Sequence, residues 1–289
     1  MTNSSSPHFI LPIRPVDPLT CQLLRQVDQA ASTTRLRYVV VGAMARDLML
    51  VNAYGLPPSR ATRDVDIGIA VENWEQFQAL KSCLGEAGRF TAAPKDEHRL
   101  YWADGDRRTP IDLIPFGGVT SEDATIAWPP SRDFVLNVAG FKEALAAAAH
   151  LRIEEDLDVP VASIPGLAAL KLIAWYDRRS RNNQDAADLV CLLEHYADAG
   201  NLDRLYEQEL PLLEAAGFDL ELTGATLLGR DAARICHANT RRQIAAVLTS
   251  ETLVDQLILQ MEQTGFHEEP RAERISVLLG RFCKGFLGG

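Results

Sequence analysis

The chain has 289 residues, of which 47% are hydrophobic and 24% charged, a composition typical of a globular protein with room for two modest domains. Its net charge is −10, which argues against broad, non-specific binding of nucleic acid or anionic membranes while leaving room for a local basic groove. No apolar run approaches the ~18 residues of a membrane helix, and residues 1–15 lack the pattern of a signal peptide. The five cysteines are scattered without metal-binding spacing, which favours reduced core thiols and a cytoplasmic protein.

The first 160 residues mix strand and helix patterns. Asp17 is expected to cap a helix over 18–31. A strand over 38–41 then leads through Gly42 into a helix over 43–51, followed by a loop over 52–59 that contains Gly55 and two prolines. Further elements are predicted as strands at 65–70, 98–103, 109–115 and 134–138, a helix at 74–84, and a turn at 104–105.

Beyond Ser163 the pattern is helical almost throughout. Ser163 and Pro165 suit the start of a helix, and further helices are expected at 183–197, 203–215, 225–237, 239–250, 252–263 and 270–286. The segment 154–160 breaks both patterns, so we place a domain boundary between residues 158 and 159. The expected class is α/β (α+β), with a small mixed sheet flanked by helices and an all-helical C-terminal domain.

Three aspartates lie in apolar strand patterns. Asp64 and Asp66 are two residues apart in RDVDIGI, and strand geometry sends such residues to the same face. Asp112 lies alone among apolar neighbours in PIDLIPF. Like charges at this spacing repel unless a cation lies between them, and an oxygen cage from adjacent strands suits Mg²⁺. We therefore expect the three carboxylates to converge on one cleft.

Structural alternatives remain open for each of these aspartates. Asp64 and Asp66 could face water while their apolar neighbours face the core. Asp112 is costly if buried alone, and a metal, a role as a general base or pairing with Arg107 or Arg108 would each explain it.

A glycine turn and a buried lysine add to the pattern. Gly42 follows YVVV and precedes a helix, where backbone amides can hold a phosphate, although an ordinary strand-to-helix glycine looks the same. Lys171 interrupts the apolar stretch LAALKLIAW, and its head could snorkel to water or meet a triphosphate together with Arg178, seven residues on. Asp185 and Asp188 could orient this lysine or activate a nucleophile.

These segments together resemble a known superfamily. VVVGAMARDL, TRDVDI and PIDLIPF resemble the nucleotidyltransferases of DNA polymerase beta type, and SIPGLAALKLIAWYDRRSRNNQDAADLVCLL is similar to bacterial AbiEii-type nucleotidyltransferases, which include type IV toxins of toxin–antitoxin pairs. The resemblance covers roughly residues 36–195. It departs from the family at Ala43, where glycine or serine is usual, and in a longer gap from Gly42 to Asp64, whose excess maps to the loop at 52–59.

The resemblance implies a role for each matching residue. It makes Asp64 and Asp66 metal ligands and Asp112 the third carboxylate, a metal ligand and base. It assigns Gly42, Ala43 and Arg46 to NTP binding, Lys171 and Arg178 to the NTP phosphates, and Asp185 to the acidic position of the helical domain. On that assignment, alanine at 171 weakens NTP binding more than folding.

The implied reaction is Mg²⁺-dependent transfer of NMP from an NTP to an acceptor hydroxyl. The candidate acceptors are tRNA, a protein and a small molecule, the acidic composition speaking against RNA. A cognate antitoxin is a candidate partner, and no membrane association is expected. The alternatives are a non-catalytic nucleotide- or partner-binding module of the same fold and a metal-dependent phosphohydrolase.

Overall fold

A computed structural model of the chain describes residues 9–58, 62, 64–94, 96–263 and 269–288, with the side chains of 269–272 left out. The described residues divide into two compact units, one formed by 1–136 and 145–163 and the other by 137–144 and 164–289. The predicted boundary between residues 158 and 159 stays a prediction. Arg63 and residue 59 of the predicted loop lie outside the described residues.

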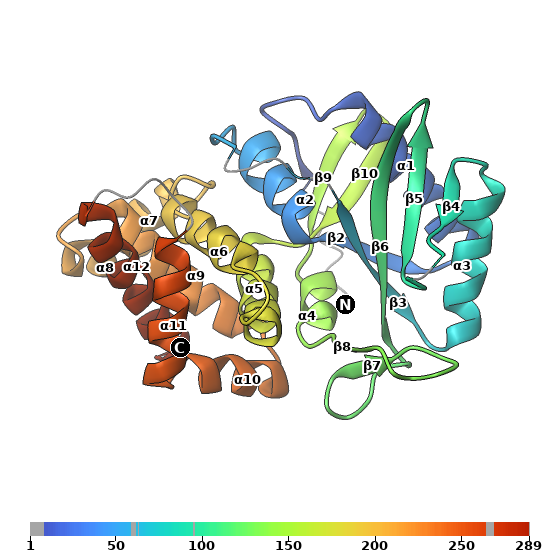
Figure 1. Ribbon diagram of the computed structural model, residues 1–289. Coiled ribbons are helices and arrows are strands. Elements are labelled where there is room, and N and C mark those ends of the chain that lie inside the picture. Colours follow the sequence, from blue (N-terminus) through green and yellow to red (C-terminus); the bar gives the residue numbers. More distant parts are fainter. Residues whose placement is uncertain (1–8, 59–61, 63, 95, 264–268, 289) are drawn as a thin grey trace, which may run out of the picture. The chain divides into compact units, whose positions relative to one another are not determined.

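The first unit is built on a mixed sheet of eight strands in the order β1-β9-β10-β2-β3-β6-β5-β4 (Figure 1). The strands are β1 Phe9–Ile10, β2 Arg37–Val41, β3 Val65–Val71, β4 Phe90–Ala92, β5 Arg99–Asp104, β6 Arg107–Gly117, β9 Ala149–Glu154 and β10 Leu157–Val161. A separate two-stranded sheet joins β7 Thr125–Ala127 to β8 Val135–Asn137. The mixed sheet and the helical region confirm the predicted fold class.

The centre of the large sheet determines where the candidate site lies. β3 runs antiparallel to β2 and parallel to β6, and β5 runs antiparallel to β6. The register places Val41, Asp66, Asp112 and Arg99 in one row across these four strands. Because paired residues of neighbouring strands point to the same face, Asp66 and Asp112 share a face of the sheet. The predicted adjacency of the two aspartate-bearing strands is confirmed.

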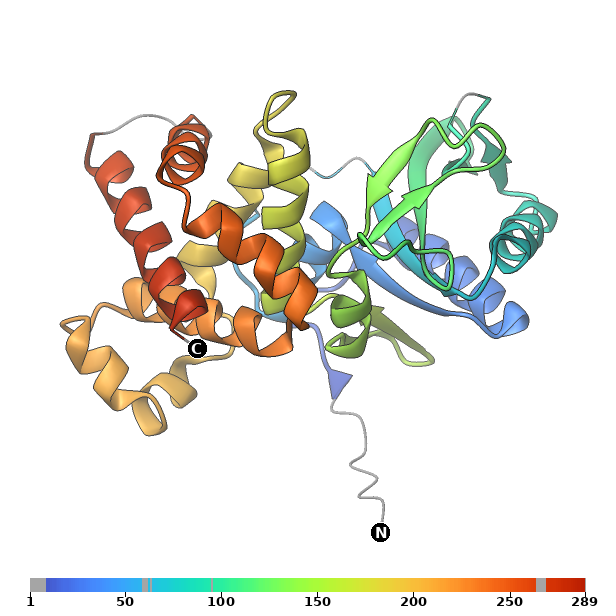
Figure 2. The ribbon, with the colours of Figure 1, turned by 90° about the horizontal axis from the view of Figure 1, so that it is seen from below.

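The helices of this unit are α1 Pro18–Thr34, α2 Gly42–Asp47, the π-helix η1 Leu48–Ala53 and α3 Trp74–Glu86. Helix α4 Phe141–Ala146 has its first four residues in the second unit and its last two in the first. Asp17 caps α1 as predicted, accepting from the backbone N–H of Thr20 at 3.1 Å. The α1 side chains Leu24 and Val27 are fully buried, and the Trp102 indole of β5 donates to Gln26 at 2.9 Å. Helices α1 and α3 lie side by side (Figure 2).

The sequence did not predict the hairpin β9–β10. The segment 154–160 looked like a break between domains because of its acidic residues and Pro160. In the structure the turn at 155–156 joins two antiparallel strands, and the inward residues Leu157, Val159 and Val161 are buried. β10 also pairs in parallel with β2, so this hairpin extends the sheet.

The second unit is helical. Its helices are α5 Ile164–Arg178, α6 Gln184–His195, α7 Leu202–Glu207, α8 Leu210–Ala215, α9 Leu220–Ile235, α10 Ala238–Leu248, α11 Glu251–Glu262 and α12 Glu269–Leu287. The helix predicted over 203–215 is thus two short helices, and the one predicted from 225 begins five residues earlier, where Asp219 caps it. The core includes Leu227 and Leu228 of α9 with Phe282 and Phe286 of α12.

No single helix among the described residues is long and apolar enough to cross a membrane. Helices α10 and α11 reach that length and composition only when they are taken together, and an 80° bend separates them.

Candidate active site

Gly42 and Asp66 are packed against each other at the start of α2. Gly42 has a backbone φ of +69°, which a residue with a side chain rarely adopts. A Cβ built on Gly42 would lie 2.0 Å from Oδ2 of Asp66, so the carboxylate fills the space that a side chain would need. Glycine is therefore required here for two independent reasons, and the strand-to-helix turn brings backbone and carboxylate into contact.

Asp64 and Asp66 are both partly exposed, and neither is buried in the core. Val65 and Ile67, which alternate with them, are 1% and 0% exposed. This pattern matches the strand alternation predicted from the sequence, with apolar residues on the covered face and carboxylates on the other. The arrangement leaves two acidic side chains close to solvent beside the Gly42 turn.

Asp112 has a partner that the sequence analysis missed. Arg99 lies directly opposite it on β5, and its Nε and Nη2 donate to Oδ1 and Oδ2, each at 2.7 Å. Asp112 is 9% exposed, and Nε2 of His98 lies 4.0 Å from its Oδ1. These bonds to the carboxylate raise the pKa of the Arg99 guanidinium. The planar fork of arginine thus satisfies both carboxylate oxygens of the third aspartate.

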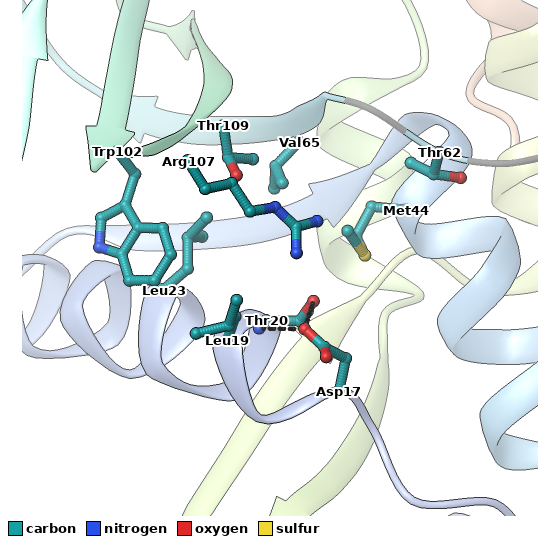
Figure 3. A pocket seen from close by; sticks show the side chains of 10 residues that line it. All are labelled: Asp17, Leu19, Thr20, Leu23, Met44, Thr62, Val65, Trp102, Arg107 and Thr109. Atoms are coloured by element: carbon teal, nitrogen blue, oxygen red, sulfur yellow. Dashed lines mark hydrogen bonds between the residues drawn. The ribbon is translucent and has the colours of Figure 1, made fainter. Parts of the chain in front are cut away.

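The predicted arginine partners of Asp112 point elsewhere. Figure 3 shows Arg107 pointing into a pocket of about 190 Å³ beside Met44 and Thr109. Val65 also lines this pocket, so it opens on the sheet face opposite to that of the carboxylates. The Arg108 guanidinium lies over the Tyr101 ring, 5.6 Å from its centre. The alternative reading, in which Arg107 or Arg108 pairs with Asp112, is therefore wrong, although an arginine pair does exist.

The three aspartates do not form a ready-made metal cage in this conformation. Within the described part of the chain, no three histidine, cysteine, aspartate or glutamate side chains form such a group. Asp112 is paired with Arg99 through both of its oxygens. The donors are nevertheless hard oxygens of the kind that Mg²⁺ prefers, and Asp66 and Asp112 lie in register on neighbouring strands. The chemistry of these carboxylates fits a divalent cation.

Arg46 is buried and paired with the neighbouring Asp47. Its side chain is 1% exposed, and its Nε and Nη2 donate to Oδ1 of Asp47 at 2.9 and 2.6 Å. The hydroxyl of Thr62 donates to the other carboxylate oxygen of Asp47. This chain of contacts braces α2 against the segment that precedes β3. Such burial argues against the predicted contact of Arg46 with phosphate. Ala43, next to the glycine turn, is also buried, at 5% exposure.

The helical unit holds a second cluster of charges. Nζ of Lys171 lies 2.6 Å from Oδ2 of Asp188 and 3.2 Å from Oδ1 of Asp185, and its side chain is 9% exposed. Arg178 donates to both oxygens of Asp185 and is half exposed. Both aspartates therefore orient the lysine, as one reading of the sequence suggested, and its head does not reach water as a snorkelling lysine would.

This burial changes the expected effect of replacing Lys171. Removing one partner of a buried ion network leaves the other charges uncompensated, and this strongly destabilises a fold. Alanine at this position should therefore affect folding at least as much as NTP binding. Whether Lys171 faces the carboxylates of the first unit stays a prediction.

Three of the cysteines are not activated nucleophiles. None of the five forms a disulfide. Burial raises the pKa of the Cys21 and Cys283 thiols to about 11 and that of Cys236 to about 12. A thiol with such a pKa stays protonated near neutral pH and is a poor nucleophile. The roles of these three are structural, as the sequence indicated.

Several solved structures share similarity with the chain. An antigenic nucleotidyltransferase-like protein from Paracoccidioides brasiliensis is 18% identical, with a TM-score of 0.40, over 71% of this chain and 94% of that one. ANT(2'')-Ia in complex with adenylyl-2''-tobramycin is 14% identical, with a TM-score of 0.36, over 68% and 96%. The Thermotoga maritima CCA-adding enzyme complexed with tRNA is 13% identical, with a TM-score of 0.27, over 96% and 82%. These similarities are too weak to indicate a substrate.

A family profile, which matches most of the chain, shows the sequence family. No curated protein matches the chain. The family profile described as nucleotidyl transferase AbiEii toxin, type IV TA system, matches residues 22–234, a span that contains Gly42, the three aspartates and Lys171. The chain therefore belongs to the AbiEii family of nucleotidyltransferase toxins.

Proposed function

We propose that this nucleotidyltransferase moves NMP from an NTP to an acceptor hydroxyl with the help of Mg²⁺, using Asp64, Asp66 and Asp112 as ligands. The observation that carries the proposal is the packing of the Asp66 carboxylate on Gly42 at the start of α2. This contact supports the proposal because a carboxylate oxygen, the kind of ligand that Mg²⁺ prefers, lies beside the backbone that would receive the phosphates.

Each group at the start of α2 and on strands β3 and β6 would have its own role in the transfer. The backbone at Gly42 and Ala43 would hold the phosphates, with no side chain in the way at the glycine. Asp64, Asp66 and Asp112 would hold the cation, and Asp112, on the neighbouring strand, would also orient the acceptor hydroxyl and accept its proton. When bound, the divalent cation would neutralise charge on the phosphates and the leaving oxygen.

Arg99 is the partner of Asp112 when no ligand is bound. With both oxygens held by one guanidinium, this carboxylate is kept paired and its buried charge is compensated. Each oxygen of Asp112 keeps a further lone pair with which it could join the other two aspartates, but the nearby positive charge of Arg99 would oppose a cation there. The Arg99 pair would therefore weaken the hold of Asp112 on the cation.

Lys171 and Arg178 would contribute from the helical unit to the NTP phosphates, with Asp185 and Asp188 holding the lysine in place. The toxin–antitoxin description of the family supports a cognate antitoxin as partner. Five cysteines that form no disulfide support a reducing compartment such as the cytoplasm. The acceptor could be tRNA, a protein or a small molecule.

The test is label transfer from each α-labelled NTP, with Mg²⁺ and a cell extract as the source of acceptors, followed by pyrophosphate release. Asp66→Asn should abolish both signals. Asp203→Asn is the matched control, because Asp203 is an exposed aspartate in the helical unit. Pyrophosphate release that persists in Asp66→Asn would contradict the proposal. A wild-type protein that binds NTP without releasing pyrophosphate would favour the alternative of a non-catalytic nucleotide-binding module.

A further inference from the structure

A second pocket lies next to Asp112 and has no assigned role. It has a volume of about 220 Å³ and is formed where the segment 96–98 meets the segment 128–134. His98 lines it, and Nε2 of His98 lies 4.0 Å from Oδ1 of Asp112. His98 therefore connects the pocket to the third carboxylate, toward the end of the register row that is farther from the Gly42 turn.

The walls of this pocket are aromatic. The His98 and Phe134 rings are stacked, with centres 5.1 Å apart and an angle of 11° between their planes. Trp128 lies 5.6 Å from the His98 ring and 5.5 Å from the Phe134 ring. Trp128 is buried, whereas Phe134 is 46% exposed. Phe134 thus has accessible ring surface on which a planar ligand can extend the existing stack.

The polar groups of the pocket suit a ligand with both an acceptor atom and an amino group. Within the described part of the chain, the indole N–H of Trp128 is the buried side-chain donor that has no hydrogen-bond partner. A buried donor without an acceptor is rare in native proteins and calls for an explanation such as a ligand or water. Asp96 and Glu97, both exposed, add acceptors and negative charge at the pocket. That charge favours amino groups and disfavours phosphates.

We propose that this pocket binds the acceptor, and that the acceptor presents there a planar heteroaromatic ring with an exocyclic amino group, as in cytosine or adenine. The proposal rests on the proposed nucleotidyl transfer, since it is Asp112 that gives the pocket its place in the reaction. The ring stacks on Phe134, and its ring acceptor atom meets the Trp128 donor. Its amino group faces Asp96 and Glu97, while the reacting hydroxyl lies toward Asp112.

The matched probes are cytidine and uridine, which differ at two adjacent ring positions. Cytidine has an amino group beside a ring nitrogen that accepts a hydrogen bond, whereas uridine has a keto group beside a ring N–H. Each is titrated into the full-length protein without metal, and binding is followed by ligand-observed NMR. Cytidine should bind more tightly than uridine. Phe134→Ala should weaken cytidine binding about tenfold, in line with measured base–aromatic stacking, and Phe134→Leu should weaken it similarly. Phe218→Ala, at an exposed phenylalanine of the helical unit, should leave it unchanged.

The acidic wall and the NTP site are tested separately. Glu97→Gln should lower the preference for cytidine over uridine by about two- to fivefold, the scale of an exposed charge interaction. Cytidine binding should persist when a non-hydrolysable NTP and Mg²⁺ are present in excess. Equal binding of the two nucleosides, displacement of cytidine by the NTP, or binding that Phe134→Ala leaves unchanged would overturn the proposal.

The two proposals can fail independently. Transfer that depends on Asp66, together with no cytidine binding at Phe134, would place the acceptor elsewhere and leave the proposed function intact. Cytidine binding at Phe134 without any pyrophosphate release would leave the pocket intact and remove the proposed chemistry.

Discussion

The contact between Gly42 and Asp66 yields the sharpest prediction. Alanine at position 42 meets two separate costs. Holding a side chain at a φ of +69° costs about 1–2 kcal/mol. The new Cβ would also lie 2.0 Å from the Asp66 carboxylate, so that side chain must move, which adds about 1–3 kcal/mol as overpacking does elsewhere. We therefore expect Gly42→Ala to destabilise the fold by about 2–5 kcal/mol in urea unfolding.

Gly88 provides the matched control. It has a φ of +78°, and a Cβ built on it would meet no atom within 4 Å. Gly88→Ala should therefore incur the conformational cost alone, about 1–2 kcal/mol, and leave nucleotide transfer unchanged. Gly42→Ala should in addition abolish most Mg²⁺-dependent transfer, because the displaced carboxylate is the proposed ligand.

A double-mutant cycle isolates the contact. In an Asp66→Ala background the carboxylate is gone, so the cost of Gly42→Ala should fall toward that of Gly88→Ala. Equal destabilisation by Gly42→Ala in both backgrounds, or a Gly42→Ala protein with full transfer activity, would refute the reasoning.

Three further changes test the charge pairs. Lys171→Ala should destabilise the helical unit by about 3–5 kcal/mol in urea unfolding, because the ammonium between the buried carboxylates of Asp185 and Asp188 is lost; a loss below about 1 kcal/mol would show that the network is not buried in solution. Arg99→Ala should lower the Mg²⁺ concentration that gives half-maximal transfer, because the positive charge that opposes a cation at Asp112 is removed; a higher requirement would mean that Arg99 positions the ligand. Hydrogen bonds from Arg274 lower the pKa of Asp219 below its usual 3.8. The stability from this pair is thus present above that pH and is lost as pH falls through the depressed pKa, so Arg274→Met should reduce the loss of stability on acidification.

The sequence predicted the elements that carry the site because their patterns are local. The strands around Asp66 and Asp112 alternate apolar and polar residues, and Gly42 ends an apolar run, so their positions follow from periodicity. From the sequence we could expect β3 and β6 to be neighbours, but not that they run parallel. The register that sets Asp66 opposite Asp112 depends on packing far from either residue.

Arg99 was missed because the turn was predicted one residue too early. A two-residue loop at 104–105 would set Arg99 opposite Pro110, whereas the observed loop lies between Asp104 and Arg107, and this shift sets Arg99 opposite Asp112. The hairpin β9–β10 was hidden for another reason. Its charged turn and Pro160 resemble an interdomain linker, and only its pairing with β2 makes it part of the sheet.

The proposed role of Asp66 is tested most directly by cation binding itself. Mn²⁺, which reports its free concentration by electron paramagnetic resonance, is titrated into the full-length protein with a non-hydrolysable NTP. The wild type should bind about two ions per chain, as two-metal transfer sites do. Asp66→Asn should lose this binding while Asp203→Asn keeps it. Equal Mn²⁺ binding by the wild type and Asp66→Asn would contradict the assignment of Asp66, packed on Gly42, as the ligand of the catalytic cation.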